Sequence, residues 1–143
     1  MKPLVCAVLL LATPAVAQET VVKLNIRFDT ATTTFLQEKG ELVVVSGWFY
    51  GEPALGNVLP VDETGMIYLG GEEITVWPLD QTVTLGQNLG AAPVGTVVEP
   101  KVNVNVYSAR ISSDDNLLDC TFVEGPTNAL SKSPQEITCT LMK

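Results

Sequence analysis

Two segments of the chain place apolar residues at every second position. In residues 22–28 the even positions are Val, Leu, Ile and Phe, and the odd positions are Lys, Asn and Arg. In residues 102–107 the even positions are all Val, and the odd positions are Asn, Asn and Tyr. A period of two is typical of a strand with one buried and one solvated face. We therefore predict an amphipathic strand in each segment.

Residues 41–50 have apolar residues at both odd and even positions, which predicts a central strand covered on both faces. Residues 66–69 and 73–77 flank the double glycine Gly70–Gly71, and a double glycine between strand-like segments is typical of a tight hairpin turn. Pro78 ends the second of these strands, because proline offers no N–H to a ladder of hydrogen bonds.

The rest of the chain predicts shorter elements and loops. Residues 30–40 are predicted as a loop or one turn, since three consecutive β-branched threonines disfavour a helix. Residues 124–135 contain a Gly-Pro and a Ser-Pro pair, which rule out a long helix there. Short strands are predicted at residues 82–85, 96–98, 117–122 and 137–141.

Seven to nine short strands separated by turns predict an all-β fold, a two-sheet antiparallel sandwich of immunoglobulin-like or prealbumin-like type. A small closed β-barrel is the alternative. The two strands with a polar face favour the open sandwich, whose outer faces are solvated. The immunoglobulin order Cys…Trp…Cys is missing, because the two C-terminal cysteines follow both tryptophans. The prediction is therefore an architecture and not a family.

The N-terminal segment has the pattern of a cleaved signal peptide. A lysine precedes an apolar run over residues 4–12, and Ala15 and Ala17 stand at the small-residue positions of a cleavage site. The run is too short to cross a bilayer as a helix, which takes about 20 residues. We therefore predict removal of residues 1–17, a single domain over residues 18–143, and no transmembrane anchor.

Cleavage would leave two cysteines, Cys120 and Cys139, both in strand-like runs. An even number of cysteines in an exported chain predicts a disulfide, here between two nearby C-terminal strands. No N-x-[ST] sequon follows residue 17. Together with the short signal segment, this favours a bacterial periplasmic or secreted protein.

Charge and composition exclude several kinds of chemistry. The chain of 143 residues has 8 Lys and Arg against 16 Asp and Glu, a formal charge of -8, and no histidine. Without histidine there is no Ser-His-Asp or Cys-His nucleophile and no histidine-ligated zinc. An acidic surface does not attract the phosphate backbone of a nucleic acid. We predict neither an enzyme nor a nucleic-acid-binding protein, and no cofactor.

One group of oxygen-bearing side chains is a candidate calcium site. Asp114, Asp115, Asn116 and Asp119 offer the oxygen ligands that Ca²⁺ prefers. However, the spacing lacks the EF-hand pattern, and an Asp-Asp-Asn sequence between two strands is also ordinary turn chemistry. The spacing favours the turn, and calcium stays the alternative.

The aromatic run from Trp48 to Tyr50 is the best candidate for recognition. On a strand, Trp48 and Tyr50 point to one face and Phe49 to the other. Trp and Tyr are enriched at interface hot spots, but aromatic residues near strand ends also plug sandwich cores, and both interpretations stay open. Acidic residues of the following loop would favour a basic partner at this surface. They are Glu52, Asp62 and Glu63.

These features predict a non-enzymatic module of the bacterial cell envelope, an inhibitor, adaptor or other binding protein that acts through loops and the aromatic residues. The alternative is a structural or assembly subunit in which an exposed edge strand pairs with a partner. The edges distinguish the two, since a binding module has edges blunted by charge or proline. Prolines border several predicted strands, which favours the binding module: Pro53, Pro60, Pro78, Pro93 and Pro100.

Overall fold

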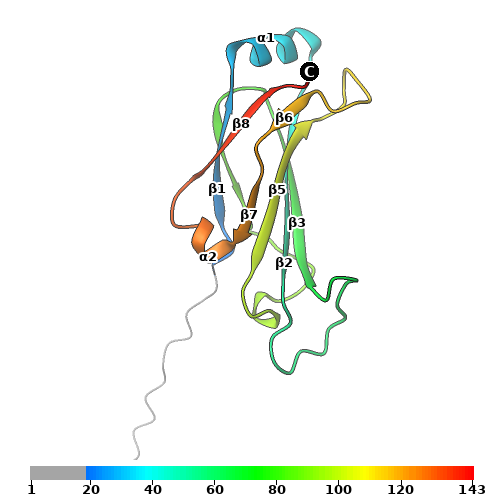
Figure 1. Ribbon diagram of the computed structural model, residues 1–143, viewed down its shortest axis with the longest axis vertical. Coiled ribbons are helices and arrows are strands. Elements are labelled where there is room, and N and C mark those ends of the chain that lie inside the picture. Colours follow the sequence, from blue (N-terminus) through cyan, green and yellow to red (C-terminus); the bar gives the residue numbers. More distant parts are fainter. Residues whose placement is uncertain (1–18) are drawn as a thin grey trace, which may run out of the picture.

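The computed structural model describes residues 19–143, so the predicted signal peptide lies outside the described residues. The described strands form two four-stranded sheets (Figure 1). The first sheet, in the order β4-β1-β8-β6, consists of Gln81–Leu85, Val22–Phe28, Gln135–Leu141 and Leu118–Cys120. The second sheet, in the order β3-β2-β5-β7, consists of Ile67–Val76, Val43–Gly51, Lys101–Ser108 and Val123–Pro126. No helix among residues 19–143 is long and apolar enough to cross a membrane.

The two sheets pack as the predicted sandwich and do not close into a barrel. Neighbouring strands are antiparallel except for β1 and β8, which run parallel. Most inward residues of the two amphipathic strands are fully buried, among them Leu24 and Ile26 on β1 and Val102 and Val104 on β5. The period-two pattern therefore placed both strands and their core faces correctly.

The central strand β2 positions the candidate site. Val43, Val45 and Phe49 are fully buried between the sheets. The positions that alternate with them are half-buried or exposed, so the prediction of a strand covered on both faces is wrong. Trp48, on the outer face, stacks on Tyr68 of the neighbouring strand β3 instead of lying under a second layer.

Strand β3 runs without interruption from Ile67 to Val76, so the predicted hairpin turn at Gly70–Gly71 is wrong. β2 is long enough to pair with the whole of β3, and the pairing register shifts next to Phe49, which lies opposite Gly70. Gly70 has a φ of 139°, a conformation that residues with a side chain rarely adopt. The double glycine therefore forms a bulge in one strand and does not reverse the chain.

Residues 30–40, predicted as a loop or one turn, form the helix α1 (Thr30–Lys39) at the top of Figure 1. The Asp29 carboxylate caps this helix by accepting a hydrogen bond from a first-turn N–H at 2.7 Å. Gly40 ends it in the left-handed conformation. Leu36 is fully buried. The two caps and this packing outweigh the low helix propensity of the threonines.

The strand predicted at residues 96–98 is also wrong. The 3₁₀ turn η1 (Val94–Thr96) occupies its beginning, and Val97 makes one isolated bridge, to Pro53. Pro93 and Pro100 bracket this segment, and proline has no N–H for a strand ladder.

The C-terminal cysteines form the predicted disulfide. Cys120 of β6 and Cys139 of β8 lie directly opposite each other in an antiparallel pair, and their Sγ atoms are bonded. Between them the chain forms β7 and the short helix α2 (Thr127–Leu130), neither of which was predicted. β7 pairs with β5 and thereby completes the sheet that carries the candidate site.

Candidate functional site

The outer face of the β3-β2-β5-β7 sheet carries a row of aromatic, amide and acidic residues. Trp48 of β2 pairs with Gly71 of β3 on one side and with Asn103 of β5 on the other. Asn103 in turn pairs with Glu124 of β7. An aromatic ring, an amide and a carboxylate from three strands therefore come together on one sheet face.

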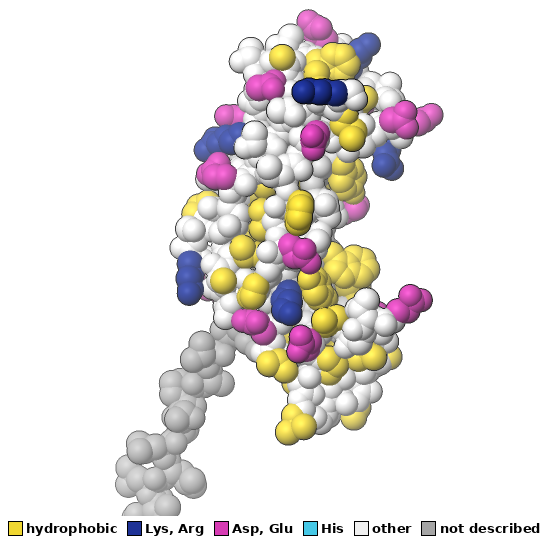
Figure 2. Space-filling view, in the orientation of Figure 1, with side chains coloured by type: hydrophobic (Ala, Val, Ile, Leu, Met, Phe, Trp, Pro, Cys, Tyr) yellow, Lys and Arg dark blue, Asp and Glu magenta, His cyan; other side chains and the backbone are white. Residues whose placement is uncertain are grey.

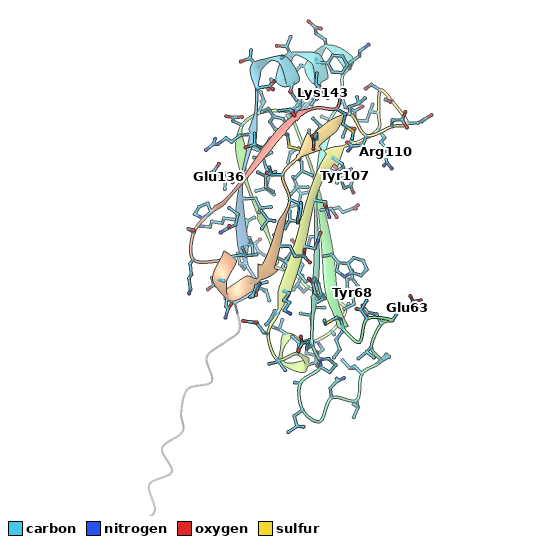
Figure 3. The ribbon with its side chains drawn as sticks, viewed as in Figure 1. Glu63, Tyr68, Tyr107, Arg110, Glu136 and Lys143 are labelled. Atoms are coloured by element: carbon cyan, nitrogen blue, oxygen red, sulfur yellow. A yellow bond between two sulfur atoms is a disulfide. The ribbon has the colours of Figure 1, made fainter. Side chains whose placement is uncertain are left out.

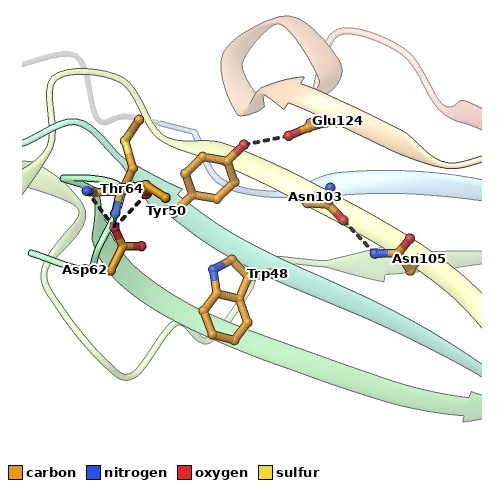
Figure 4. A pocket seen from close by; sticks show the side chains of 8 residues that line it. Trp48, Tyr50, Asp62, Thr64, Asn103, Asn105 and Glu124 are labelled. Carbon is orange, nitrogen blue, oxygen red and sulfur yellow. Dashed lines mark hydrogen bonds between the residues drawn. The ribbon is translucent and has the colours of Figure 1, made fainter.

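A shallow hollow of about 500 Å³ lies on the β5 side of Trp48, and we call it the Tyr50 hollow (Figure 4). Its lining comes from β2, β5, β7 and the loop between β2 and β3. The lining residues are Trp48, Tyr50, Asp62, Thr64, Met66, Asn103, Asn105 and Glu124. The Tyr50 hydroxyl donates to Glu124 Oε1 at 2.9 Å, and Asn105 Nδ2 donates to Asn103 Oδ1 at 2.6 Å. These bonds hold the side chains of the hollow in fixed positions.

The Tyr50 hollow is negatively charged. Burial raises the pKa of Tyr50 above its usual value of 10.0, and the hydrogen bond and negative charge of Glu124 raise it further. Asp62 Oδ1 accepts hydrogen bonds from the Thr64 N–H at 2.8 Å, the Thr64 hydroxyl at 2.7 Å and the Met66 N–H at 3.0 Å. These bonds, that of the Thr64 hydroxyl most, lower the pKa of Asp62. At neutral pH Tyr50 is therefore neutral and Asp62 carries a negative charge.

A second hollow of about 260 Å³ lies on the β3 side of Trp48, and we call it the Tyr68 hollow. Its lining residues are Ser46, Gly47, Trp48, Tyr68, Gly71, Glu72 and Glu73. The rings of Trp48 and Tyr68 stack with their centroids 4.2 Å apart and their planes tilted by 32°. Because Trp48 lines both hollows, its ring forms the wall between them.

The carboxylates around the two hollows form no ion pair within residues 19–143. Glu73 accepts a hydrogen bond from the Tyr107 hydroxyl at 2.8 Å. Glu72 accepts two from backbone N–H groups of the loop after β4, both at 3.0 Å. Arg110 acts on Tyr107 electrostatically at the far end of this face (Figure 3). The ion pairs of the described chain lie elsewhere: Arg27–Asp80, Arg27–Glu136 and Lys101–Glu52.

Three of the predicted contact residues line the Tyr50 hollow: Trp48, Tyr50 and Asp62. Trp48 is 54% exposed, so the alternative in which it plugs the core is wrong. Glu52 does not line the hollow, and its Oε1 lies 3.7 Å from the Nζ of Lys101. Glu63 projects from the loop beyond the hollow and does not line it either (Figure 3).

Sequence analysis missed the lining residues on the strands beside β2: Tyr68, Glu72, Glu73, Asn103, Asn105 and Glu124. The period-two pattern placed Asn103 and Asn105 on a solvated face, but only the strand order shows that Trp48 shares this face. The predicted hairpin at Gly70–Gly71 put Glu72 and Glu73 beside a turn instead of along the edge of the site.

The residues considered for calcium make the contacts of a turn. Asn116 Oδ1 accepts hydrogen bonds from the N–H groups of Ser108 and Leu118 at 3.0 and 3.1 Å. Residues 19–143 contain no group of three or more His, Cys, Asp or Glu placed to hold a metal ion. The three aspartates of this segment are exposed: Asp114, Asp115 and Asp119.

No protein-family model, no curated protein and no solved structure matches the chain. The fold and the site define a two-sheet β-sandwich with an acidic and aromatic surface on one sheet. The function therefore has to be inferred from the chemistry of the two hollows.

Proposed function

We propose that this protein is a non-enzymatic binding module, of the inhibitor or adaptor type, that holds a basic segment of a protein partner on the outer face of the β3-β2-β5-β7 sheet. The proposal rests on one observation, the exposure and position of Trp48. It is 54% exposed and stands between two hollows. A large aromatic ring left in water offers a partner much apolar area at little conformational cost, and tryptophan is enriched at interface hot spots.

The charge of the face favours a basic partner. Aromatic rings attract Lys and Arg through cation–π contacts, and carboxylates beside the ring add to the attraction. Both hollows combine these two elements, and no cation of residues 19–143 pairs with their acids. Figure 2 shows hydrophobic side chains gathered at the lower right of the view, over the β2–β3 loop and the adjoining strand ends, with acidic side chains beside them.

The contacts inside the hollows support binding and not catalysis. The chain has no histidine, and the carboxylates of Glu73 and Glu124 accept hydrogen bonds from tyrosine hydroxyls. Such bonds fix a carboxylate in place for recognition. The proposal includes no cofactor.

We place the protein in the bacterial periplasm or outside the cell, after cleavage behind Ala17. The disulfide between Cys120 and Cys139 supports this location, because disulfides form and persist in oxidising compartments. The signal-like N-terminal sequence supports it independently.

The sheet edges favour this module over an assembly subunit that uses an edge strand. Three edge strands, β4, β6 and β7, have only 5, 3 and 4 residues. The long edge strand β3 has a bulge and the charged pair Glu72 and Glu73. The Leu69 carbonyl of β3 also accepts hydrogen bonds from the loop N–H groups of Ala91 and Ala92, at 3.2 and 3.4 Å. Bulges, charges and covering loops are devices that block strand addition.

The proposal is tested by calorimetric titration of the protein with Lys- and Arg-rich peptides and with Glu-rich peptides of the same length. Basic peptides should bind and acidic peptides should not. Trp48→Ala should weaken binding about tenfold, which corresponds to the loss of one good cation–π contact, about 1.4 kcal/mol.

Trp77→Ala is the matched control. Trp77 is 67% exposed but lines neither hollow, so this variant should bind like the wild type. Equal weakening in the two variants, or equal binding of basic and acidic peptides, would show that the face is not the binding site.

A further inference from the structure

The loop between β2 and β3 presents apolar side chains to water. It extends beyond the strand ends at the bottom of Figure 1, at the end of the sandwich opposite α1. Leu55 and Val58 are 106% and 93% exposed, so their side chains make almost no contact with the rest of the protein. Leu59 and Val61 of the same loop are exposed as well. Apolar side chains that gather in one exposed place mark an interaction surface.

The tip of this loop, residues 53–61, contains no charge. Its sequence is Pro-Ala-Leu-Gly-Asn-Val-Leu-Pro-Val. A hollow of about 380 Å³ lies between the tip and the turn η1, and none of the nine residues that line it is charged. The acids stand at the base of the loop instead, with Glu52 before the tip and Asp62 and Glu63 after it. The loop is therefore apolar at its end and acidic at its base.

Hydrogen bonds inside the protein hold the tip in one shape. The Asn57 side chain accepts from the Leu59 N–H at 3.1 Å and donates to the Leu59 carbonyl at 3.0 Å. The Asn57 N–H donates to the Ala54 carbonyl at 3.0 Å, and the Ala54 N–H donates to the Thr96 carbonyl at 2.8 Å. Because these polar groups already have partners, they lose little when the tip leaves water for an apolar phase.

The same bonds favour a lipid over a protein as the partner of the tip. Protein interfaces contain about one hydrogen bond per 100–200 Å². The only polar side chain of residues 53–61 is that of Asn57, and it is already bonded within the loop. The side chains of the tip therefore offer a protein partner apolar area without hydrogen bonds, whereas lipid hydrocarbon requires no such bonds.

The acids at the base of the loop indicate which surface the tip can approach. A second copy of this chain would bring two sets of these acids together, and like charges repel. An anionic lipid surface would be repelled by them and by the formal charge of -8. A zwitterionic surface has no net charge, and its outward ammonium groups attract carboxylates at the depth of the loop base.

We infer that the tip of the β2–β3 loop docks on a zwitterionic lipid surface, with Leu55 and Val58 inserted among the lipid headgroups and the two sheets in water. This inference goes beyond the proposed function and does not depend on it. The contact is weak and reversible, because a few aliphatic side chains bury less apolar area than one acyl chain, which itself binds a membrane only reversibly. Docking would keep the Tyr50 hollow close to the membrane, since Asp62 belongs both to the loop base and to the lining of the hollow.

Co-sedimentation with lipid vesicles tests the inference. The chain from Gln18 onward is used, because it contains every described residue and lacks the apolar run of residues 4–12, which would itself bind lipid. The protein should bind vesicles of phosphatidylcholine, and its affinity should change by less than about threefold between low and high salt, because salt screens charges but not apolar contacts. Vesicles rich in phosphatidylglycerol should bind it more weakly.

Leu55→Ser and Ile111→Ser form a matched pair of variants. Both replace an exposed aliphatic side chain of the same composition, but Ile111 (60% exposed) lies on the loop after β5, at the opposite end of the sandwich. Leu55→Ser should lower the affinity for phosphatidylcholine vesicles at least about tenfold, since each methylene removed from lipid costs about fourfold. Val58→Ser should act in the same way, and Ile111→Ser should bind like the wild type. Circular dichroism checks that all three variants are folded.

Several results would overturn the inference. It is refuted if the protein does not sediment with phosphatidylcholine vesicles, if it binds only anionic vesicles, or if Leu55→Ser and Ile111→Ser weaken binding equally. If the wild type forms dimers in light scattering and Leu55→Ser abolishes them, the tip contacts a second copy and not a lipid.

These results are distinguishable from a failure of the proposed function. Leu55 lines neither the Tyr50 hollow nor the Tyr68 hollow. Leu55→Ser should therefore bind basic peptides like the wild type in the absence of lipid, and Trp48→Ala is the variant that should not. A loss of peptide binding in Leu55→Ser would show that the loop tip belongs to the peptide site, which would overturn the separate role of the tip.

Discussion

The outer faces of the two sheets share the same period-two pattern, but they differ in whether their charged side chains are paired with opposite charges. On the first sheet, Arg27 Nη1 lies 3.7 Å from Asp80 Oδ2, and Arg27 Nε lies 3.5 Å from Glu136 Oε2. Asn25 Nδ2 donates to Glu136 Oε1 at 2.6 Å, and the Thr82 hydroxyl donates to Asn25 Oδ1 at 2.8 Å. These side chains of the first face pair with one another.

On the second sheet, aromatic rings stand among carboxylates that have no cation from residues 19–143. Figure 3 shows Tyr68 and Tyr107 on one side of the molecule and Glu136 on the other. A face that pairs its own charges has little left for a partner, whereas uncompensated charge beside exposed aromatic area is an interaction surface. We therefore expect carboxylates without a cation beside an aromatic ring, and not exposure alone, to mark the binding face.

The largest effect should come from two neighbouring residues of β2 that face opposite ways. Phe49 is fully buried and Trp48 is 54% exposed. Phe49→Ala should lower the free energy of unfolding by about 3–5 kcal/mol. Trp48→Ala should lower it by less than about 1.5 kcal/mol, since it loses mainly the ring contact with Tyr68. Urea unfolding followed by circular dichroism measures both values.

If Trp48→Ala lowered the free energy of unfolding by more than about 3 kcal/mol, Trp48 would be a core residue, and the contrast between the two outer faces would be wrong. A small loss in Phe49→Ala would instead show that β2 is turned over relative to the structure, with the opposite face in the core.

The disulfide provides a way to weaken the first sheet without changing any residue that lines the two hollows. It joins β6 to β8 across 19 positions, and closing a loop of this length restricts the unfolded chain by about 3 kcal/mol. The double variant Cys120→Ser, Cys139→Ser should therefore unfold at a lower temperature, while peptide binding by the second sheet at 10–20 °C below its Tm stays unchanged. Thermal unfolding and peptide titration of this variant measure the two effects.

Thiol titration provides the control for this experiment. The chain from Gln18 onward should show no reactive thiol when it is denatured without reductant. One or two free thiols would mean that the bond is not formed in solution.

The sequence contains most of the information on each strand but little on which strands are neighbours. The alternation around Asn25 and Arg27 shows directly that β1 has a polar face. The same argument put Phe49 and Trp48 on opposite faces of β2 but left open whether Trp48 lies in the core. The partner of Tyr50 could not be predicted, because Glu124 lies 74 positions away and reaches it only through the pairing of β5 with β7. Strand order is set by packing between distant segments, and no local pattern encodes it.

The errors in the secondary structure have local causes. The threonines of α1 indicated a loop, but the cap from Asp29 and the burial of Leu36 stabilise a helix there. The double glycine indicated a turn, but a long neighbouring strand favoured a bulge at Gly70. In both cases contacts with other residues outweighed the preference of the residues themselves.

Glu41 is a carboxylate with the opposite arrangement from those of the hollows, because it is 1% exposed and saturated with hydrogen bonds. Its Oε2 accepts from the Ser112 N–H at 2.7 Å and the Ser112 hydroxyl at 2.6 Å, and its Oε1 accepts from the Ile111 N–H at 3.0 Å. Burial raises the pKa of Glu41, but these hydrogen bonds together outweigh burial and leave the pKa below 4.5. The carboxylate thereby ties the start of β2 to the loop after β5.

A depressed pKa in the folded state means that the stabilisation by Glu41 is complete above its unfolded pKa and is lost as the pH falls through the folded pKa. Glu41→Gln should therefore cost about 2 kcal/mol at neutral pH. The difference from the wild type should shrink as the pH falls below 4.5. Urea unfolding across this pH range measures it. Glu124→Gln, in an open hollow, should change stability by less than about 0.5 kcal/mol at either pH. A cost for Glu41→Gln that does not change with pH would mean that it comes from shape and not from charge.

The smallest effect on stability is expected at Arg27, whose side chain is 48% exposed. Exposed ion pairs contribute about 0–1 kcal/mol, so Arg27→Ala should lower the free energy of unfolding by less than about 1 kcal/mol in urea unfolding. The substitution leaves Asp80 and Glu136 without their cation. It therefore gives the first sheet the unpaired acids of the second sheet, but without an aromatic ring.

The double variant Arg27→Ala, Trp48→Ala then separates charge from aromatic surface. The Trp48→Ala change removes the ring from the second face, so any basic-peptide binding regained by adding Arg27→Ala has to come from the first. We expect none, because unpaired carboxylates in water attract a cation only weakly at physiological salt unless a ring beside them removes water from the contact. Calorimetric titration with the Lys-rich peptide measures this. Binding restored to the wild-type level would mean that uncompensated charge alone makes a binding face and that the aromatic residues of β2 and β3 are incidental to it.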